Sequence, residues 1–185
     1  MCHMEQKDYK LEGVNALLSG QFHLRALAKK LDVNHMTVSR KIKELLGENV
    51  VDFREEGKNK IYFLKNTSEA KTYVFMAENY KLNRLLKKNP SLRKIIEKIQ
   101  KNEKIKLALI FGSYAKGIAK KESDIDIYIL TEEKKIQKEI ENLDSRASVK
   151  IGKYNKQNLL VKEIEKNHVI IKGVENFYEK NKFFE

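Results

Sequence analysis

Hydrophobic residues in the first third of the chain recur at helical spacing. Apolar side chains three and four positions apart share one face of a helix, and they predict that this face packs against a core. The segments with this spacing are residues 14–18, 24–31 and 35–46. Two β-prone runs follow at 50–54 and 60–64, and the polar stretch between them contains Gly57, which is typical of a hairpin. We therefore expect residues 1–67 to form a domain of three helices and a β-hairpin.

The middle of the chain changes to two helical segments. Thr67 and Ser68 are suited to cap the first helix, and Asn89-Pro90 ends it and begins the second. We interpret residues 68–102 as a helical connector between two domains. The first helix carries more large apolar side chains than a monomeric connector needs, which predicts a homodimer through Tyr73, Phe75, Met76 and Tyr80.

Strand patterns mark the beginning of the last part of the chain. The short apolar run Leu107–Phe111 is typical of a buried strand. Ile125, Ile127 and Ile129 then alternate with other positions, which predicts a strand with one face in a core. Helix and strand patterns alternate from there, so residues 103–185 are predicted to form a small mixed sheet with helices. The expected fold class of the whole chain is α+β.

The strand with the alternating isoleucines holds two aspartates over its other face. Asp124 and Asp126 are two positions apart, and two like charges repel unless water or a cation screens them. Carboxylates are ligands that Mg²⁺ takes together with the phosphates of a substrate. Gly112-Ser113 follows the preceding strand, where a glycine lets the backbone approach a phosphate and a serine offers a hydroxyl and an amide. The pattern favours a site for Mg²⁺ and a phosphorylated ligand.

The combination of Gly-Ser, ten residues and D-x-D resembles the signature of minimal nucleotidyltransferases of the DNA polymerase β superfamily. It reads here as Gly112-Ser113, residues 114–123 and Asp124-Ile125-Asp126. The resemblance implies transfer of a nucleoside monophosphate from ATP, or another NTP, to a hydroxyl, with Mg²⁺ as cofactor. It assigns catalysis to Ser113, Asp124 and Asp126, of which the two aspartates hold the metal. It assigns nucleotide binding to Gly112, Ser113 and Lys116.

One departure from that family weakens the prediction of catalysis. The working members carry a third carboxylate on the next strand, which completes a site for two metal ions. The strand expected here has Ser148 and Lys150 on one face and no acid on either face. Asp144, just before it, is the nearest substitute, and Lys150 would place an ammonium near the missing ligand. Nucleotide binding is therefore better supported than catalysis.

The N-terminal order of helices and hairpin resembles a winged helix–turn–helix domain, whose core reads LRALAKKLDVNHMTVSRKIKEL at residues 24–45. The resemblance implies a double-stranded DNA partner, with bases read by the third helix and phosphates held by lysines. The implied base contacts are His35, Thr37, Val38, Ser39 and Arg40. The implied phosphate contacts are Lys41, Lys43, Lys58 and Lys60. A winged helix used only for protein contact stays the alternative, because residues 1–67 hold 12 basic and 9 acidic side chains, a modest excess.

Composition narrows the choice of partners. The formal net charge of +12 over 185 residues favours a polyanionic partner or substrate. No apolar run is long enough to cross a membrane. The single cysteine, Cys2, excludes an intramolecular disulfide, so we expect a cytoplasmic protein without a membrane partner.

Two functional hypotheses follow from these patterns. In the first, the chain is a nucleotidyltransferase that also binds DNA. In the second, it is a DNA-binding transcriptional regulator or an antitoxin with a toxin-like protein partner, and its nucleotidyltransferase domain is catalytically weak or inactive.

Overall fold

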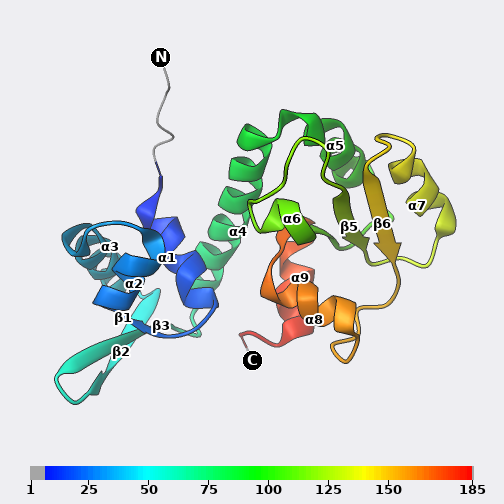
Figure 1. Ribbon diagram of the computed structural model, residues 1–185. Helices are drawn as coiled ribbons and strands as arrows, with labels where there is room; N and C mark the ends of the chain where they lie inside the picture. The colour runs from blue at the N-terminus through cyan, green and yellow to red at the C-terminus, as the bar shows by residue number, and fades with distance from the viewer. Residues whose placement is uncertain (1–6, 185) are drawn as a thin grey trace. The chain divides into compact units, whose positions relative to one another are not determined.

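The computed structural model describes residues 7–184, which fall into two compact units (Figure 1). One unit extends to Tyr80 and the other runs from Lys81 to Phe183, so the division lies within a long helix. Cys2, which supports the expected cytoplasmic location, lies outside the described residues. No helix between residues 7 and 184 is both long enough and apolar enough to cross a membrane.

The first unit begins with three helices, α1 (Tyr9–Leu18), α2 (Leu24–Leu31) and α3 (His35–Gly47). Asp8 begins α1, because its carboxylate accepts hydrogen bonds from the amides of Lys10 and Leu11. The Asn34 side chain begins α3 in the same way, accepting from the amide of Thr37 at 2.8 Å. The apolar positions of the three helices meet in a core that includes Val14, Leu17, Leu27, Ile42 and Leu45.

A three-stranded sheet completes this part of the chain. β2 (Val51–Glu56) and β3 (Asn59–Leu64) form the predicted hairpin, and β1 (Phe22–His23) pairs with the other edge of β3. The sheet order is β1-β3-β2. β1 is only two residues long, too short for an alternating pattern, and the sequence did not predict it. Three helices with a hairpin and this short strand are the arrangement of a winged helix, so the predicted fold of this region is confirmed.

The helical segments in the middle of the chain are α4 (Ser68–Lys88), the 3₁₀ turn η1 (Pro90–Leu92) and α5 (Arg93–Lys101). Thr67 supports the start of α4, because its hydroxyl accepts from the amide of Ala70 at 3.2 Å. Pro90 begins the 3₁₀ turn, and α5 itself starts three residues later than the sequence suggested.

The second unit is built on a four-stranded mixed sheet with the order β6-β5-β4-β7. Its strands are β4 (Ala108–Ile110), β5 (Ile125–Ile129), β6 (Ala147–Ile151) and β7 (Val169–Lys172). β4 pairs antiparallel with β5 and β7, whereas β5 and β6 are parallel. The helices of this unit after α5 are α6 (Gly112–Ala115), α7 (Lys134–Glu141), α8 (Leu159–Lys166) and α9 (Val174–Asn181). The α+β class predicted from the sequence is confirmed.

Helices cover both faces of this sheet (Figure 1). The isoleucines of β5 are buried in one core with Ile95 and Ile99 of α5 and Ile136 and Ile140 of α7. On the opposite face, the ring of Tyr128 lies 6.2 Å from that of Tyr154, which in turn lies 6.1 Å from Phe177 of α9. Because residues two positions apart in a strand share a face, Asp126 lies on the same face as Tyr128.

Candidate functional site

Gly112 and Asp126 lie in close contact at the end of β4. A Cβ atom added to Gly112 would be 2.2 Å from Oδ2 of Asp126, so only glycine fits beside this carboxylate in its present position. Gly112 also has φ of +66°, a conformation that other residues rarely adopt. The amide of Phe111 donates to the Asp126 carbonyl oxygen at 3.0 Å, which joins the Gly-Ser turn to the D-x-D strand. The two halves of the sequence motif therefore lie next to each other.

The two aspartates differ in their surroundings. Asp124 is exposed just before β5, whereas Asp126 is half-buried within the strand. The pKa of Asp126 is raised above its usual value, first because burial disfavours the charged carboxylate and next because Asp124 is nearby. Lys150 opposes this shift. Burial and the nearby Asp124 therefore disfavour the charged form of Asp126, and a cation bound at this place would favour it.

Strand β6 places a serine beside Asp126. In the parallel register, Asp126 pairs with Ser148 and Tyr128 pairs with Lys150. The strand position closest to the D-x-D carboxylate thus carries a hydroxyl in place of an acid. Lys150 lies two residues further along β6, and its positive charge lowers the pKa of Asp126. Burial raises the pKa of Tyr128 to about 12, and its hydroxyl donates to the Gly152 carbonyl oxygen at 2.9 Å, so this phenol stays protonated.

Asp144 has a structural partner. Arg146 donates two hydrogen bonds to the Asp144 carboxylate, from Nε to Oδ1 at 3.0 Å and from Nη2 to Oδ2 at 2.7 Å. These hydrogen bonds lower the pKa of Asp144. The same guanidinium donates to the Lys121 carbonyl oxygen at 2.6 Å and reaches the Tyr114 hydroxyl at 3.4 Å. Arg146, which the sequence did not single out, thus links the start of β6 to the segment between Gly-Ser and D-x-D.

Lys116 lies beside an acid that the sequence patterns missed. Its Nζ is 3.3 Å from Oε1 of Glu163 on α8, and both side chains are substantially exposed. Glu163 raises the pKa of Asp126 and Lys116 lowers it, so both charges act at the D-x-D site. Of the apolar residues of α8, Val161 and Ile164 are buried whereas Leu159 is 81% exposed, and nothing local to Glu163 indicates which site it faces.

Two carboxylates are what the site offers to a metal. Among residues 7–184, no three His, Cys, Asp or Glu side chains are grouped so that together they could hold a metal ion. Asp124 and Asp126 fit a single Mg²⁺ that completes its shell with phosphate oxygens and water. The close glycine and the unfavourably placed carboxylate support this fit.

Comparison with known proteins bears on this geometry. Residues 93–176 match the family model for polymerase beta, nucleotidyltransferase, which spans somewhat less than half of the chain. This region is a nucleotidyltransferase domain. The match includes Gly112, Ser113, Asp124 and Asp126, and it also includes β6, where the domain has Ser148 beside Asp126. No curated protein matches the chain.

Solved structures similar to part of the chain include bacterial regulators. The transcriptional repressor BigR from Xylella fastidiosa is 22% identical, with coverage of 37% of this chain and 67% of that one and a TM-score of 0.34. The adhesin competence repressor AdcR from Streptococcus pyogenes is 18% identical, covers 50% and 69%, and has a TM-score of 0.40. The DNA-binding protein Sso10a-2 from Sulfolobus solfataricus is 11% identical, covers 53% and 100%, and has a TM-score of 0.37. At these TM-scores the likenesses carry no inference about this chain.

The predicted DNA-contacting residues of the winged helix are not all available to a ligand. Val38 was expected among the base contacts, but it is 2% exposed, because it belongs to the apolar stripe of α3 that packs into the core. His35, Arg40 and Lys43 are exposed on α3, and Thr37, Ser39 and Lys41 are half-buried. Lys41 is also paired with Glu44 at 2.9 Å. Lys58 and Lys60 are exposed on the hairpin, with Lys60 over the Phe53 ring at 3.9 Å from its centroid.

Proposed function

We propose that this protein binds duplex DNA through its winged helix and a Mg²⁺-bound NTP through its nucleotidyltransferase domain, and that nucleotidyl transfer is slow. The observation that supports this most directly is the contact between Gly112 and Asp126, which holds the Gly-Ser turn against the D-x-D strand and leaves no room for a side chain at position 112. In this proposal Asp124 and Asp126 hold the ion, and Gly112, Ser113 and Lys116 meet the phosphates.

The slow transfer follows from β6. When bound, the ion neutralises phosphate charge and orients the nucleotide. The side chains that we assign to the ligand are those of Asp124, Asp126, Ser113 and Lys116, and strand β6 adds Ser148 and Lys150. This strand adds no acid, because Ser148 pairs with Asp126 and Asp144 is engaged with Arg146. This set favours binding of a nucleotide over activation of an attacking hydroxyl. It supports the regulator hypothesis over that of an efficient enzyme.

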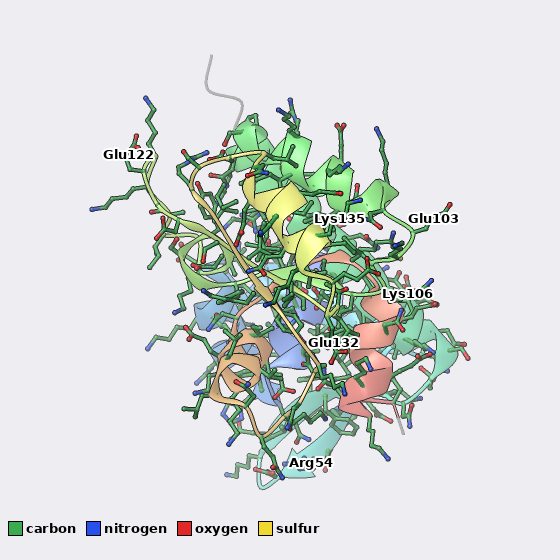
Figure 2. The ribbon with its side chains drawn as sticks, turned by 90° about the vertical axis from the view of Figure 1, so that its right-hand side faces the viewer. Arg54, Glu103, Lys106, Glu122, Glu132 and Lys135 are labelled. Carbon is green, nitrogen blue, oxygen red and sulfur yellow. The ribbon has the colours of Figure 1, made fainter. Side chains whose placement is uncertain are left out.

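Isothermal titration of ATP, with and without Mg²⁺, tests the nucleotide half of the proposal. We expect the wild-type chain to bind only with Mg²⁺, and Asp126→Asn to weaken that binding about tenfold or more, a loss of at least about 1.4 kcal/mol. Glu122→Gln is the matched control, since it removes one exposed carboxylate from the loop before β5 (Figure 2). Equal affinity for wild type and Asp126→Asn in Mg²⁺ would refute the assignment.

Duplex binding is tested with Arg40→Ala. This exposed α3 residue should contribute to the affinity for a DNA duplex, and failure of the wild-type chain to bind any duplex would favour a winged helix used for protein contact.

The homodimer remains a prediction. Of its four large side chains, Met76 is 47% exposed, whereas the Tyr73 hydroxyl donates to Glu48 and the Tyr80 hydroxyl accepts from the amide of Asp8. A toxin-like partner likewise remains a prediction of the antitoxin alternative.

A further inference from the structure

A pocket of about 310 Å³ lies in the winged helix, and three separate segments line it. The start of α2 contributes His23, Leu24 and Arg25, the start of α3 contributes His35, and the hairpin contributes Lys58, Asn59, Lys60 and Tyr62. Three of these side chains carry a positive charge, two are imidazoles, and none of the lining residues is acidic. A concave surface with this charge attracts an anion.

Two of the three cations of this pocket, Arg25 and Lys58, have no partner in the described part of the chain, and the third, Lys60, lies over the Phe53 ring. Arg25 and Lys58 make no hydrogen bond or ion pair with any residue between 7 and 184, and both are exposed. Elsewhere on the hairpin, Arg54, labelled in Figure 2, is already engaged by Glu56 at 2.8 Å and by Gln21. Because Arg25 and Lys58 have no carboxylate partner, both can form charge-assisted hydrogen bonds with an anion in the pocket.

Two neutral features of the pocket also fit an anion. No side chain caps α2 at its N-cap His23, so the amides of its first turn are open to an acceptor. Tyr62 is 7% exposed, and its hydroxyl makes no hydrogen bond with the described part of the chain although its side chain lines the pocket. The hydroxyl oxygen itself is not among the buried polar atoms that lack a partner, so it remains open to the pocket and can donate to a ligand without breaking a hydrogen bond to the protein.

We propose that this pocket is a phosphate-binding site, separate from the one in the nucleotidyltransferase domain. A phosphate seated there would accept from Arg25, from the Tyr62 hydroxyl and from the first amides of α2, between α3 and the hairpin. The phosphate could belong to the backbone of duplex DNA or to a free nucleotide. The first source rests on the DNA binding proposed above and extends it to residues outside the predicted contact set, namely His23, Arg25 and Tyr62.

The duplex arm of the test uses the full chain and fluorescence anisotropy at several salt concentrations. If the phosphate is from DNA, Arg25→Ala should lower affinity about tenfold and reduce the salt slope by about one ion. Tyr62→Phe, which removes a hydroxyl and no charge, should lower affinity less and leave the slope unchanged. Lys29→Ala is the control, because Lys29 is exposed on the same helix and does not line the pocket. Its effect should be under about twofold.

The nucleotide arm follows the imidazole NMR signals of His23 and His35 during titration with inorganic phosphate and with ATP, both without Mg²⁺. The Asp124→Asn/Asp126→Asn chain is used so that the other site does not contribute. If the phosphate is from a nucleotide, ATP should shift these signals in that chain and not after Arg25→Ala, whereas duplex affinity stays unchanged. Either pattern supports the site and identifies its source. Failure of wild type to bind duplex would remove the DNA half of the proposed function and leave this arm decisive.

The result that overturns the pocket is specific. It is duplex affinity unchanged in Arg25→Ala and Tyr62→Phe relative to Lys29→Ala, together with histidine signals that neither phosphate nor ATP shifts. Far-UV circular dichroism of each variant confirms that the exposed Arg25 and the conservative Tyr62→Phe leave the winged helix folded.

Discussion

The D-x-D site and the winged-helix pocket are both assigned to phosphate, and they present opposite charges to it. The first shows Asp124 and Asp126 beside a glycine. The second is lined by Arg25, Lys58 and Lys60 together with Tyr62. Asp124 and Asp126 repel an anion that approaches the first site, so a cation has to lie between the carboxylates and the anion. The positive charges of the second site attract an anion directly.

Because of this difference, the two sites should bind phosphate under different concentrations of salt and of divalent ions. Binding through arginine and lysine weakens steeply with salt, because neutralised phosphates release counterions. Binding through two carboxylates requires a divalent ion and should depend on its concentration. Under the proposed function, one chain takes up DNA and nucleotide under independent control, and substitutions in one site should leave the other ligand's affinity unchanged.

The largest effect that separates the two sites is expected from Gly112→Ala. The new Cβ would meet Oδ2 of Asp126 at 2.2 Å and would turn that carboxylate out of place. We expect Mg²⁺-dependent ATP affinity, measured by titration calorimetry, to fall about tenfold or more, equal to at least about 1.4 kcal/mol. Duplex affinity, measured by anisotropy, should not change.

Gly117→Ala is the matched control for this substitution. Gly117 has φ of +73° and open space around its Cβ position, so it shares the backbone cost and lacks the clash. Both variants should lose about 1–2 kcal/mol of unfolding free energy from the left-handed conformation. Only Gly112→Ala should lose nucleotide. Equal losses of ATP affinity in the two variants would show that the contact with Asp126 does not matter.

A gain of function at β6 is the next largest effect. Ser148→Asp adds a carboxylate at the position that pairs with Asp126, so the site should hold divalent ions more tightly and transfer nucleotide faster. An increase of about tenfold in labelling by α-labelled ATP corresponds to a barrier lower by about 1.4 kcal/mol. Lys150→Asp, which changes more charge but pairs with Tyr128, should increase the rate less. A rapid wild-type reaction that Asp144→Asn abolishes would contradict the assigned role of Asp144 as Arg146's partner.

The sequence was sufficient for the elements that carry this site and insufficient for its neighbours. Alternation of Ile125, Ile127 and Ile129 predicted β5 correctly, because a strand with one buried face leaves a local pattern. The register that places Ser148, and not the mid-strand Lys150, beside Asp126 depends on how two separate strands align. No local pattern encodes that alignment.

The same limit explains the residues that were missed. Glu163 acts on the D-x-D site from a helix far along the chain, and Arg25 and Tyr62 line the same pocket because β1, which directly precedes α2, pairs with β3. Val38 was misassigned for another reason. It lies in the part of α3 that enters DNA in winged helices, but it also belongs to that helix's apolar stripe, and burial in the core prevailed.

Arg146→Ala should produce an intermediate effect confined to the nucleotidyltransferase domain. The variant removes the hydrogen bonds that join Asp144, Lys121 and Tyr114, and it leaves the Asp144 carboxylate without its partner. We expect urea unfolding of this domain to lose about 1.5–3 kcal/mol, the range for hydrogen bonds to charged groups. Arg146→Lys should rescue only part of this loss, because an ammonium group cannot form the bidentate pair of hydrogen bonds that the guanidinium makes with Asp144. An unfolded winged helix in the same experiment would show that the effect is not local.

The smallest effect concerns Glu163, whose charge raises the pKa of Asp126. Glu163→Gln should therefore lower that pKa, as followed by carboxyl ¹³C NMR of the metal-free chain. A folded-state pKa above the usual 3.8 means that Asp126 stabilises the fold below that pH and that this contribution is lost as pH rises through the raised pKa. The substitution should move this loss to lower pH and make it smaller. Because the pair with Lys116 is exposed, the change in unfolding free energy should stay under about 1 kcal/mol.

Glu165→Gln on the same helix is the control, since Glu165 accepts from the Tyr154 hydroxyl at 3.2 Å and is not among the charges that act on Asp126. An Asp126 pKa that is unchanged or raised in Glu163→Gln would remove α8 from the D-x-D site.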